Sequence, residues 1–270
     1  MRVQLRAGNP AGMDLSEAYE NGAHIEGAET YPERWAEAAE DFRASRLAVG
    51  QARLGLRYGP HEREAFDLFV PSGRPAGLVL FLHGGYWKAF GRESWSHLAA
   101  GPMARDRAVA IPSYPLAPEA RIGAITRSAL AAARAAADAV PGAPLTVTGH
   151  SAGGHLAARI GQIGAPGLAR VVPISPLSDL APLMRTAMNE VLRIDSAEAR
   201  AESPARGRPL PGVTAEAWVG EKERAAFLDQ ARWLSEAWEV PLRIAPGRHH
   251  FDVIEPLEDG ESPLTAAICH

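Results

Sequence analysis

Short apolar runs alternate with longer helical stretches along most of the chain. The apolar runs lie at residues 78–82, 108–112, 145–148, 171–174, 215–219 and 241–244. Helical patterns are clearest at residues 121–140, 152–163 and 224–239. Strands this apolar are usually buried on both faces, so the alternation predicts β-α-β units with parallel strands and right-handed crossovers. We therefore expect one α/β domain over residues 1–270, with a doubly wound, mostly parallel sheet.

The first 48 residues predict a helical segment ahead of the sheet. Thr30 and Glu33 have the spacing of a capping box, and Pro32 suits the first turn of a helix. The apolar residues of this stretch share one helical face: Trp35, Ala38, Ala39 and Phe42. We expect an amphipathic helix that packs on the main body.

A hairpin is predicted at the start of the sheet. From Gln51 the apolar period changes to two, with runs on both sides of a turn at residues 58–61. This alternation is typical of an antiparallel pair, so we expect the mostly parallel sheet to begin with one.

Residues 176–212 form a candidate lid insertion. This connection is rich in proline, is partly helical at residues 182–193, and is long for a link between a strand and a helix. Apolar residues at helical spacing are more often core than substrate contacts. We therefore leave five residues of this segment out of the site: Leu183, Met184, Thr186, Asn189 and Leu192.

Composition excludes several classes of function. Twenty-eight basic and 32 acidic side chains give a net charge of −4, which offers no footprint for nucleic acid or an anionic membrane. The longest apolar run, at residues 76–82, is far shorter than the ~20 residues that span a bilayer. No secretory signal is visible, and the one cysteine, Cys269, allows neither an internal disulfide nor a cysteine metal cage. We expect a cytoplasmic protein, and nothing in the pattern indicates an oligomeric state.

The turn after residues 145–148 carries the first candidate chemistry. Its sequence is G-H-S-A-G, followed by a helix, which is the strand-turn-helix context of a nucleophile elbow. Small neighbours let a serine on this turn adopt a strained backbone and present its hydroxyl to the crevice at the carboxyl ends of the strands. Ser151 is therefore the predicted nucleophile, and an ordinary helix N-cap is the alternative.

The turn after residues 78–82 supplies a candidate oxyanion hole. His83-Gly84-Gly85-Tyr86-Trp87 follows that strand, at the position where α/β hydrolases place such a loop. Backbone N–H groups of Gly85, Tyr86 and Ala152 are the candidate donors, and Gly84 lets the loop turn inward. Each donor of this kind is typically worth ~3 kcal/mol of activation barrier.

A serine nucleophile needs a base and an acid that orients the base. His249 and His250 follow the last strand, where the base belongs when the chain order is serine, acid, histidine. Position does not separate these two histidines. The acid is also open, because three carboxylates follow neighbouring strands: Asp179, Glu221 and Glu223.

Four motifs resemble the kynurenine formamidase (arylformamidase) branch of the α/β-hydrolase superfamily. They are F-L-H-G-G-Y-W at 81–87, Y-P-L-A-P-E at 114–119, G-H-S-A-G-G-H-L at 149–156 and H-F-D-V-I-E at 250–255. The resemblance implies an α/β-hydrolase fold, His250 as base and Glu223 as acid, although that family often has aspartate at the acid position.

The resemblance also implies a substrate class. It points to a small-molecule acyl substrate of the N-formylkynurenine type, an aryl formamide, hydrolysed through an acyl-enzyme. The alternative is a carboxylesterase that acts on short-chain or aryl esters. A non-catalytic binding protein on a hydrolase scaffold is a remote alternative. This chemistry needs no cofactor.

Other residues near these motifs have simpler interpretations. Tyr86 and Trp87 are candidate substrate-binding residues, because aromatic rings there would line an aryl pocket, but such rings are as often packing residues. His83, His150 and His155 do not have the spacing of a zinc site, so we predict no metal.

Overall fold

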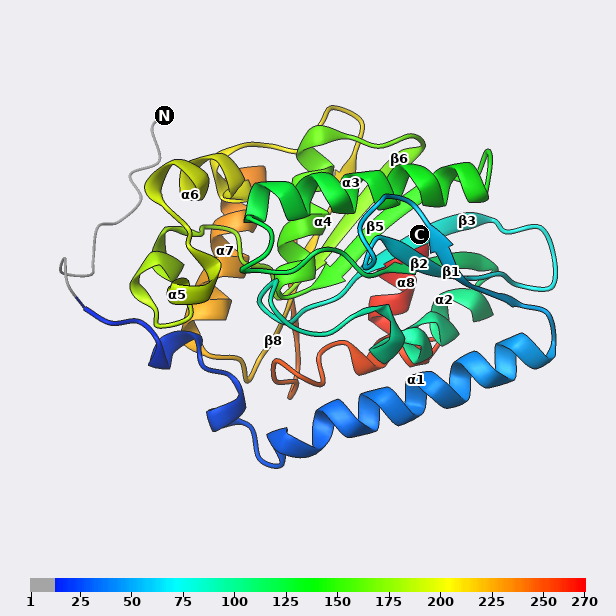
Figure 1. The fold of residues 1–270 in the computed structure, drawn as a ribbon, viewed down its shortest axis with the longest axis horizontal. Helices are drawn as coiled ribbons and strands as arrows, with labels where there is room; N and C mark the ends of the chain where they lie inside the picture. Colours follow the sequence, from blue (N-terminus) through cyan, green and yellow to red (C-terminus); the bar gives the residue numbers. More distant parts are fainter. Residues whose placement is uncertain (1–12) are drawn as a thin grey trace.

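The computed structural model describes residues 13–270 and shows one large sheet between two layers of helices (Figure 1). The strand order is β1-β2-β4-β3-β5-β6-β8-β9, with the short β7 paired to β6. β1 pairs antiparallel with β2, and β2 with β4, whereas the later pairs are parallel. The strands are β1 (Ala52–Arg57), β2 (Ala65–Phe69), β3 (Gly77–Leu82), β4 (Arg107–Pro112), β5 (Leu145–His150), β6 (Leu168–Ile174), β7 (Thr214–Ala215), β8 (Ala217–Gly220) and β9 (Leu242–Ala245).

Helices cover both faces of this sheet. Figure 1 shows α3 and α4 on one side and α1, α2 and α8 on the other. The α-helices are α1 (Tyr31–Ala48), α2 (Ala100–Ala104), α3 (Ile122–Ala139), α4 (Ala152–Ile163), α5 (Asn189–Leu192), α6 (Ser196–Glu202), α7 (Ala225–Trp238) and α8 (Pro263–Cys269). The 3-10 helices are η1 (Glu17–Tyr19), η2 (Gly22–His24), η3 (Ala28–Thr30), η4 (Arg92–Ser94), η5 (Ser96–Ala99), η6 (Ala181–Arg185), η7 (Pro204–Arg206) and η8 (Glu255–Glu258).

Two apolar cores follow from the alternation of side chains along the strands. In β3, Leu78, Leu80 and Leu82 belong to the core that includes α3 and α4, whereas Val79 and Phe81 belong to the core that includes α1 and α8. All six residues of β3 are buried, as expected for a central strand covered on both faces. The doubly wound α/β architecture and the N-terminal hairpin predicted from the sequence are confirmed.

The N-terminal segment differs from its prediction. Residues before 13 lie outside the described part, and η1, η2 and η3 replace a continuous helix up to Thr30. The predicted capping box is wrong, because Thr30 has helical backbone angles, whereas an N-cap residue is normally extended. Its hydroxyl donates instead to the carbonyl of Gly27 at 2.8 Å. The predicted apolar face is confirmed, since Trp35 and Ala39 are buried and Phe42 packs against the same core as Trp35.

The carboxyl ends of β3, β5, β6, β8 and β9 carry the predicted site motifs on neighbouring strands. β5 runs to His150, two residues beyond the predicted strand, so the nucleophile turn begins where the strand ends. The predicted strand at 215–219 is divided at Glu216 into β7 and β8. Within the described chain, no helix is both long and apolar enough to cross a membrane.

Candidate active site

Ser151 occupies a strained turn between β5 and α4. Its backbone angles are φ 56° and ψ −116°, in a region that non-glycine residues rarely adopt, and its side chain does not cap α4. Two glycines make the turn possible. A Cβ on Gly149 would lie 2.4 Å from the carbonyl oxygen of Gly153, and a Cβ on Gly153 would lie 1.9 Å from that of Leu82. The turn therefore has the geometry of a nucleophile elbow and not that of an N-cap.

The loop after β3 lies against this turn. A Cβ built on Gly84 would be 3.3 Å from Cβ of Ser151. Gly85 and Tyr86 both have positive φ, of 104° and 48°, so the loop is folded sharply inward. Within residues 13–270, the backbone N–H groups of Gly85, Tyr86 and Ala152 donate no hydrogen bond. Three free donors therefore lie on the two turns that meet beside the serine.

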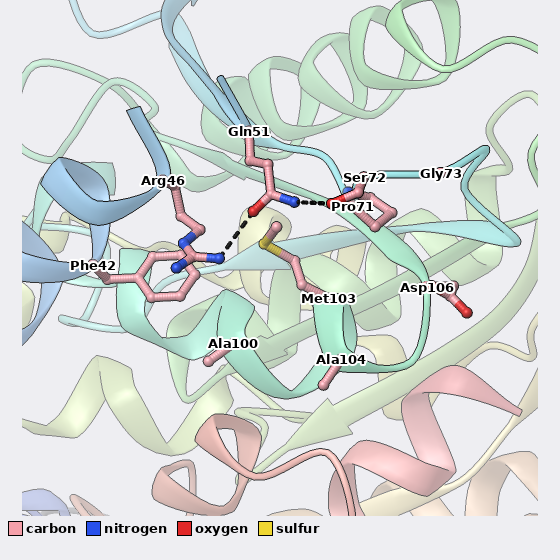
Figure 2. A pocket seen from close by; sticks show the side chains of 10 residues that line it. All are labelled: Phe42, Arg46, Gln51, Pro71, Ser72, Gly73, Ala100, Met103, Ala104 and Asp106. Carbon is pink, nitrogen blue, oxygen red and sulfur yellow. Dashed lines mark hydrogen bonds between the residues drawn. The ribbon is translucent and has the colours of Figure 1, made fainter. Parts of the chain in front are cut away.

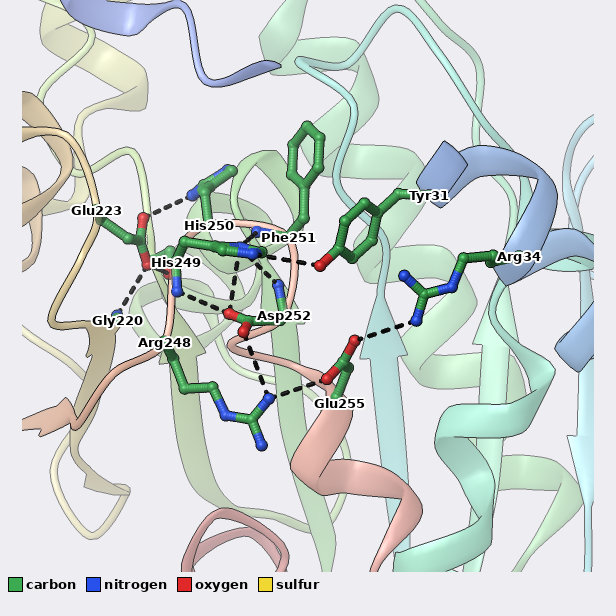
Figure 3. Close-up of polar contacts among 11 residues, drawn as sticks. Tyr31, Arg34, Gly220, Glu223, Arg248, His249, His250, Phe251, Asp252 and Glu255 are labelled. Carbon is green, nitrogen blue, oxygen red and sulfur yellow. Dashed lines mark hydrogen bonds and ion pairs between the residues drawn. The ribbon is translucent and has the colours of Figure 1, made fainter. Parts of the chain in front are cut away.

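Glu223 and His250 come together from the ends of β8 and β9 (Figure 3). His250 Nδ1 lies 2.6 Å from Glu223 Oε2, and both side chains are buried. The other carboxylate oxygen accepts hydrogen bonds from the backbone N–H of Gly220, at 2.8 Å, and from the hydroxyl of Ser175. Because a carboxylate only accepts, His250 Nδ1 carries the proton and Nε2 is left as a base.

The two other candidate acids lie elsewhere. Glu221 is exposed, and its carboxylate accepts the backbone N–H of Gly247 at 2.7 Å. Asp179 accepts the backbone N–H of Ala181 at 2.9 Å, at the start of η6. Neither carboxylate contacts His250, so the structure brings only Glu223 to that imidazole among these three.

His249 points in a different direction from His250 (Figure 3). Its Nε2 lies 3.2 Å from the hydroxyl of Tyr31, and its Nδ1 accepts the backbone N–H of Phe251 at 3.1 Å. The backbone N–H of His249 donates to the Asp252 carboxylate at 2.6 Å. Both ring nitrogens are thus occupied by the packing of the last loop on α1, which makes His249 a structural neighbour of the site.

Ser151 and His250 line one cavity of about 840 Å³. Three parts of the chain form its wall: the N-terminal segment, the loop after β3, and the start of α5. Tyr86, a predicted substrate-binding residue, lines this cavity. Asn21, Phe90 and Met188 also line it, and none of these three was predicted from the sequence. Of these three residues, only Phe90 could have been found from the sequence, because it is aromatic and closely follows the loop motif at 83–87.

Trp87, a candidate substrate-binding residue, is a packing residue instead. It is fully buried and does not line the cavity. Its ring packs edge-on against His155, with ring centroids 5.0 Å apart. Positive φ values at Tyr86 and Trp87 reverse the chain, so the second aromatic ring turns into the core beneath the loop.

Most of the chain matches a known protein family. Residues 79–239 match the family described as alpha/beta hydrolase fold. The chain belongs to the alpha/beta hydrolase family.

Similar proteins include formamidases and esterases. The chain is 28% identical to the kynurenine formamidase of Salmo salar and 26% identical to that of Danio rerio, over 240 residues each. These matches cover 80% and 81% of this chain, and 81% of each relative. A crystal structure of a protein from Silicibacter sp., named "putative thioesterase", is 52% identical with a TM-score of 0.92, and the match covers 96% of this chain and 100% of that one. The esterase of Pyrobaculum calidifontis, at 21% identity and a TM-score of 0.66, covers 89% of this chain and 92% of its own, and shares the fold.

The other histidines of the predicted motifs in this alpha/beta hydrolase, His83, His150 and His155, are buried. His83 stacks on Tyr114 with centroids 4.3 Å apart, and His155 Nε2 lies 2.7 Å from the carbonyl oxygen of Glu202. His150 lies beside His250, and burial holds its pKa well below the usual value. In the described part of the chain, no group of three or more His, Cys, Asp or Glu side chains converges as a metal site would require.

Buried neutral histidines predict a loss of stability in acid. Burial lowers the pKa of His97 to about 4, with a further lowering by Arg43, whereas the unfolded chain titrates near 6.5. Between these values the unfolded chain binds the extra proton, so the free energy of unfolding falls as the pH falls from about 6.5 to about 4. His97→Gln removes this group, and the variant should lose stability less steeply, by up to about 1.4 kcal/mol per pH unit. Urea unfolding at several pH values measures both slopes, and equal slopes would contradict the assignment.

A second groove lies away from Ser151 and His250, between α1 and α2 (Figure 2). It has a volume of about 430 Å³, and the Arg46 guanidinium lies over the Phe42 ring in its wall. Arg46 also donates to the side chain of Gln51 at 2.9 Å, which in turn donates to Ser72. The side chains of Arg46, Gln51 and Ser72 thus satisfy one another along this wall.

Proposed function

We propose that this protein is a serine hydrolase that cleaves an aryl formamide of the N-formylkynurenine type through an acyl-enzyme. The observation that supports this most is the meeting of three turns at one cavity: the strained Ser151, the inward loop after β3, and the Glu223–His250 pair. Similarity to two kynurenine formamidases supports the substrate class. Fold and site alone accommodate many acyl groups, so the substrate follows from the relatives and the serine chemistry from the geometry.

The first half of the reaction forms the acyl-enzyme. Ser151 Oγ attacks the formyl carbon while its proton passes to His250 Nε2, and Glu223 stabilises the imidazolium that forms. The carbonyl oxygen becomes an oxyanion, held by backbone N–H groups of Gly85, Tyr86 and Ala152. Collapse of this intermediate breaks the C–N bond, and the departing amine takes the proton from His250.

The second half releases the acid. A water molecule gives its proton to His250 Nε2 and attacks the formyl carbon of the ester on Ser151. The C–O bond to Ser151 then breaks, and the serine oxygen recovers the proton from His250. The products are the free arylamine and formic acid, which ionises to formate by losing its proton to water, and the enzyme returns to its starting protonation state.

Ester or thioester hydrolysis is the second candidate. The 52% identity to the protein named "putative thioesterase" favours it, and the same triad chemistry serves either bond. The leaving atom is then oxygen or sulfur, and every other step is unchanged.

Substrate comparison separates the two candidates. We expect a kcat/KM of ~10⁴ M⁻¹s⁻¹ or more for N-formylkynurenine, measured beside p-nitrophenyl acetate and an acyl thioester, with Ser151→Ala as the background control. Turnover of the ester or thioester alone would make the protein an esterase or thioesterase. Turnover of none of them would favour a binding protein on a hydrolase scaffold.

A further inference from the structure

Ser175 lies between two parts of the site that are far apart in the sequence. It immediately follows β6, the strand that lies between β5 and β8 in the sheet. β5 leads into the turn of Ser151, and β8 leads into the turn of Glu223. Ser175 is fully buried and does not line the cavity, so a substrate does not touch it.

Backbone hydrogen bonds connect the end of β6 to both neighbouring strands. The carbonyl oxygen of Ile174 accepts the backbone N–H of Ser151 at 2.9 Å. The backbone N–H of Ser175 donates to the carbonyl oxygen of Trp218, in β8, at 2.7 Å. Two successive residues thus hold the nucleophile turn on one side and the strand before the acid on the other. A side chain at position 175 is therefore fixed relative to Ser151.

The side chain of Ser175 extends this connection to the acid. Its hydroxyl donates to Glu223 Oε1, because an ionised carboxylate only accepts. The other donor to Oε1 is the backbone N–H of Gly220, at 2.8 Å, on the turn that carries Glu223 itself. Oε2 faces His250 Nδ1. Within residues 13–270, Ser175 and His250 are the only side chains that bind this carboxylate.

The backbone of Ser175 shows that its hydroxyl is present at a cost. Its φ is 48°, in the left-handed region that glycine adopts freely and other residues adopt with strain. Glycine would form the same turn and the same backbone hydrogen bonds with less strain. What serine adds at this position is the hydroxyl group, and that group binds Glu223.

We propose that Ser175 is a positioning residue, which acts through Glu223 by holding its carboxylate toward His250. The inference rests on the proposed function and applies to whichever acyl bond is cleaved. A glutamate side chain has one more rotatable bond than an aspartate, so a carboxylate held by its own turn alone keeps rotational freedom. A donor from the neighbouring strand removes that freedom before substrate binds, so the carboxylate is already in place when the imidazolium forms.

Two substitutions test this role, because Ser175→Gly and Ser175→Ala both remove the hydroxyl and the glycine also relieves the backbone strain. We expect each variant to lower kcat by about 20-fold, the effect of one lost hydrogen bond to a charged group. KM should stay within about twofold, because residue 175 does not line the cavity. The measurement is steady-state turnover of N-formylkynurenine and p-nitrophenyl acetate.

Ser178→Ala is the matched control. Ser178 is also fully buried and lies in the same connection after β6, but its hydroxyl lies 3.0 Å from the side-chain oxygen of Gln230 and does not bind Glu223. Its variant should lose stability and keep kcat within about twofold of wild type.

A double-mutant cycle separates positioning from a merely structural role. If Ser175 acts through the Glu223 carboxylate, its hydroxyl has nothing to hold once that carboxylate is removed. Ser175→Gly should then lower kcat of the Glu223→Ala protein by less than about twofold. A structural role would give the same loss of about 20-fold in both backgrounds.

The outcomes distinguish this inference from the proposed function. Losses in the single variants that disappear in the Glu223→Ala background support the inference. Near wild-type kcat for Ser175→Gly, or equal losses in the two backgrounds, overturn it. Melting curves establish that the variants are folded, and if Ser175→Ala is not, Ser175→Gly gives the same comparison. Wild type that turns over neither substrate would instead refute the proposed function, and with it any reaction for Ser175 to serve.

Discussion

Ser151→Ala should lower kcat by about 10⁴-fold or more while leaving the fold intact. The hydroxyl is the atom that forms the acyl-enzyme in this account, so its loss removes the covalent step altogether. What remains is the contribution of substrate binding and of the backbone donors at Gly85, Tyr86 and Ala152. The measurement is steady-state turnover of N-formylkynurenine and p-nitrophenyl acetate by wild type and variant.

Stability provides the control for this variant. Ser151 does not cap α4, so alanine there removes no helix-capping hydrogen bond, and its smaller side chain fits wherever serine did. We expect the melting temperature to change by no more than a few degrees. A folded Ser151→Ala protein that retains most of its activity would show that another group attacks the substrate.

Glu223→Gln should lower kcat by about 10³-fold or more. Glutamine keeps the size of the side chain but replaces the carboxylate that accepts the proton of His250 Nδ1. The imidazole then loses the partner that sets its tautomer and stabilises its cation, so Nε2 is no longer held as a base. Steady-state kinetics on the same two substrates gives the size of the loss.

Glu221→Gln is the matched control for the acid. Glu221 lies two residues before Glu223 and is exposed, and its carboxylate accepts the backbone N–H of Gly247. The kcat of its variant should therefore stay within about threefold of wild type. Equal losses in the two variants, or a larger loss for Glu221→Gln, would place the acid elsewhere.

Much of the fold and the central motifs could be predicted from the sequence because their signals are local. Gly149 and Gly153 flank Ser151 at a fixed spacing, and the structure shows that a Cβ at either position would collide with backbone atoms. The apolar runs of the central strands are likewise visible in short windows. Resemblance to a family, and not spacing, selected Glu223 and His250, and the structure places these two side chains in contact.

The cavity wall could not be predicted in the same way, because it depends on contacts between distant segments. Asn21 lies 130 positions before Ser151 along the chain, and only the folding of the N-terminal segment over the carboxyl ends of the strands brings both to one cavity. The direction of Trp87 depends on a backbone reversal at two positive-φ residues, which its residue type does not indicate. The misplaced cap at Thr30 has a similar cause, since η3 runs directly into α1.

Covalent labelling of the nucleophile tests the central claim most directly. The protein is treated with an organophosphate fluoride, digested, and mapped by mass spectrometry, with Ser151→Ala treated in parallel. We expect one adduct, on Ser151, formed together with the loss of activity, and none at that peptide in the variant. An adduct on a different residue, or full activity after complete labelling of Ser151, would contradict it.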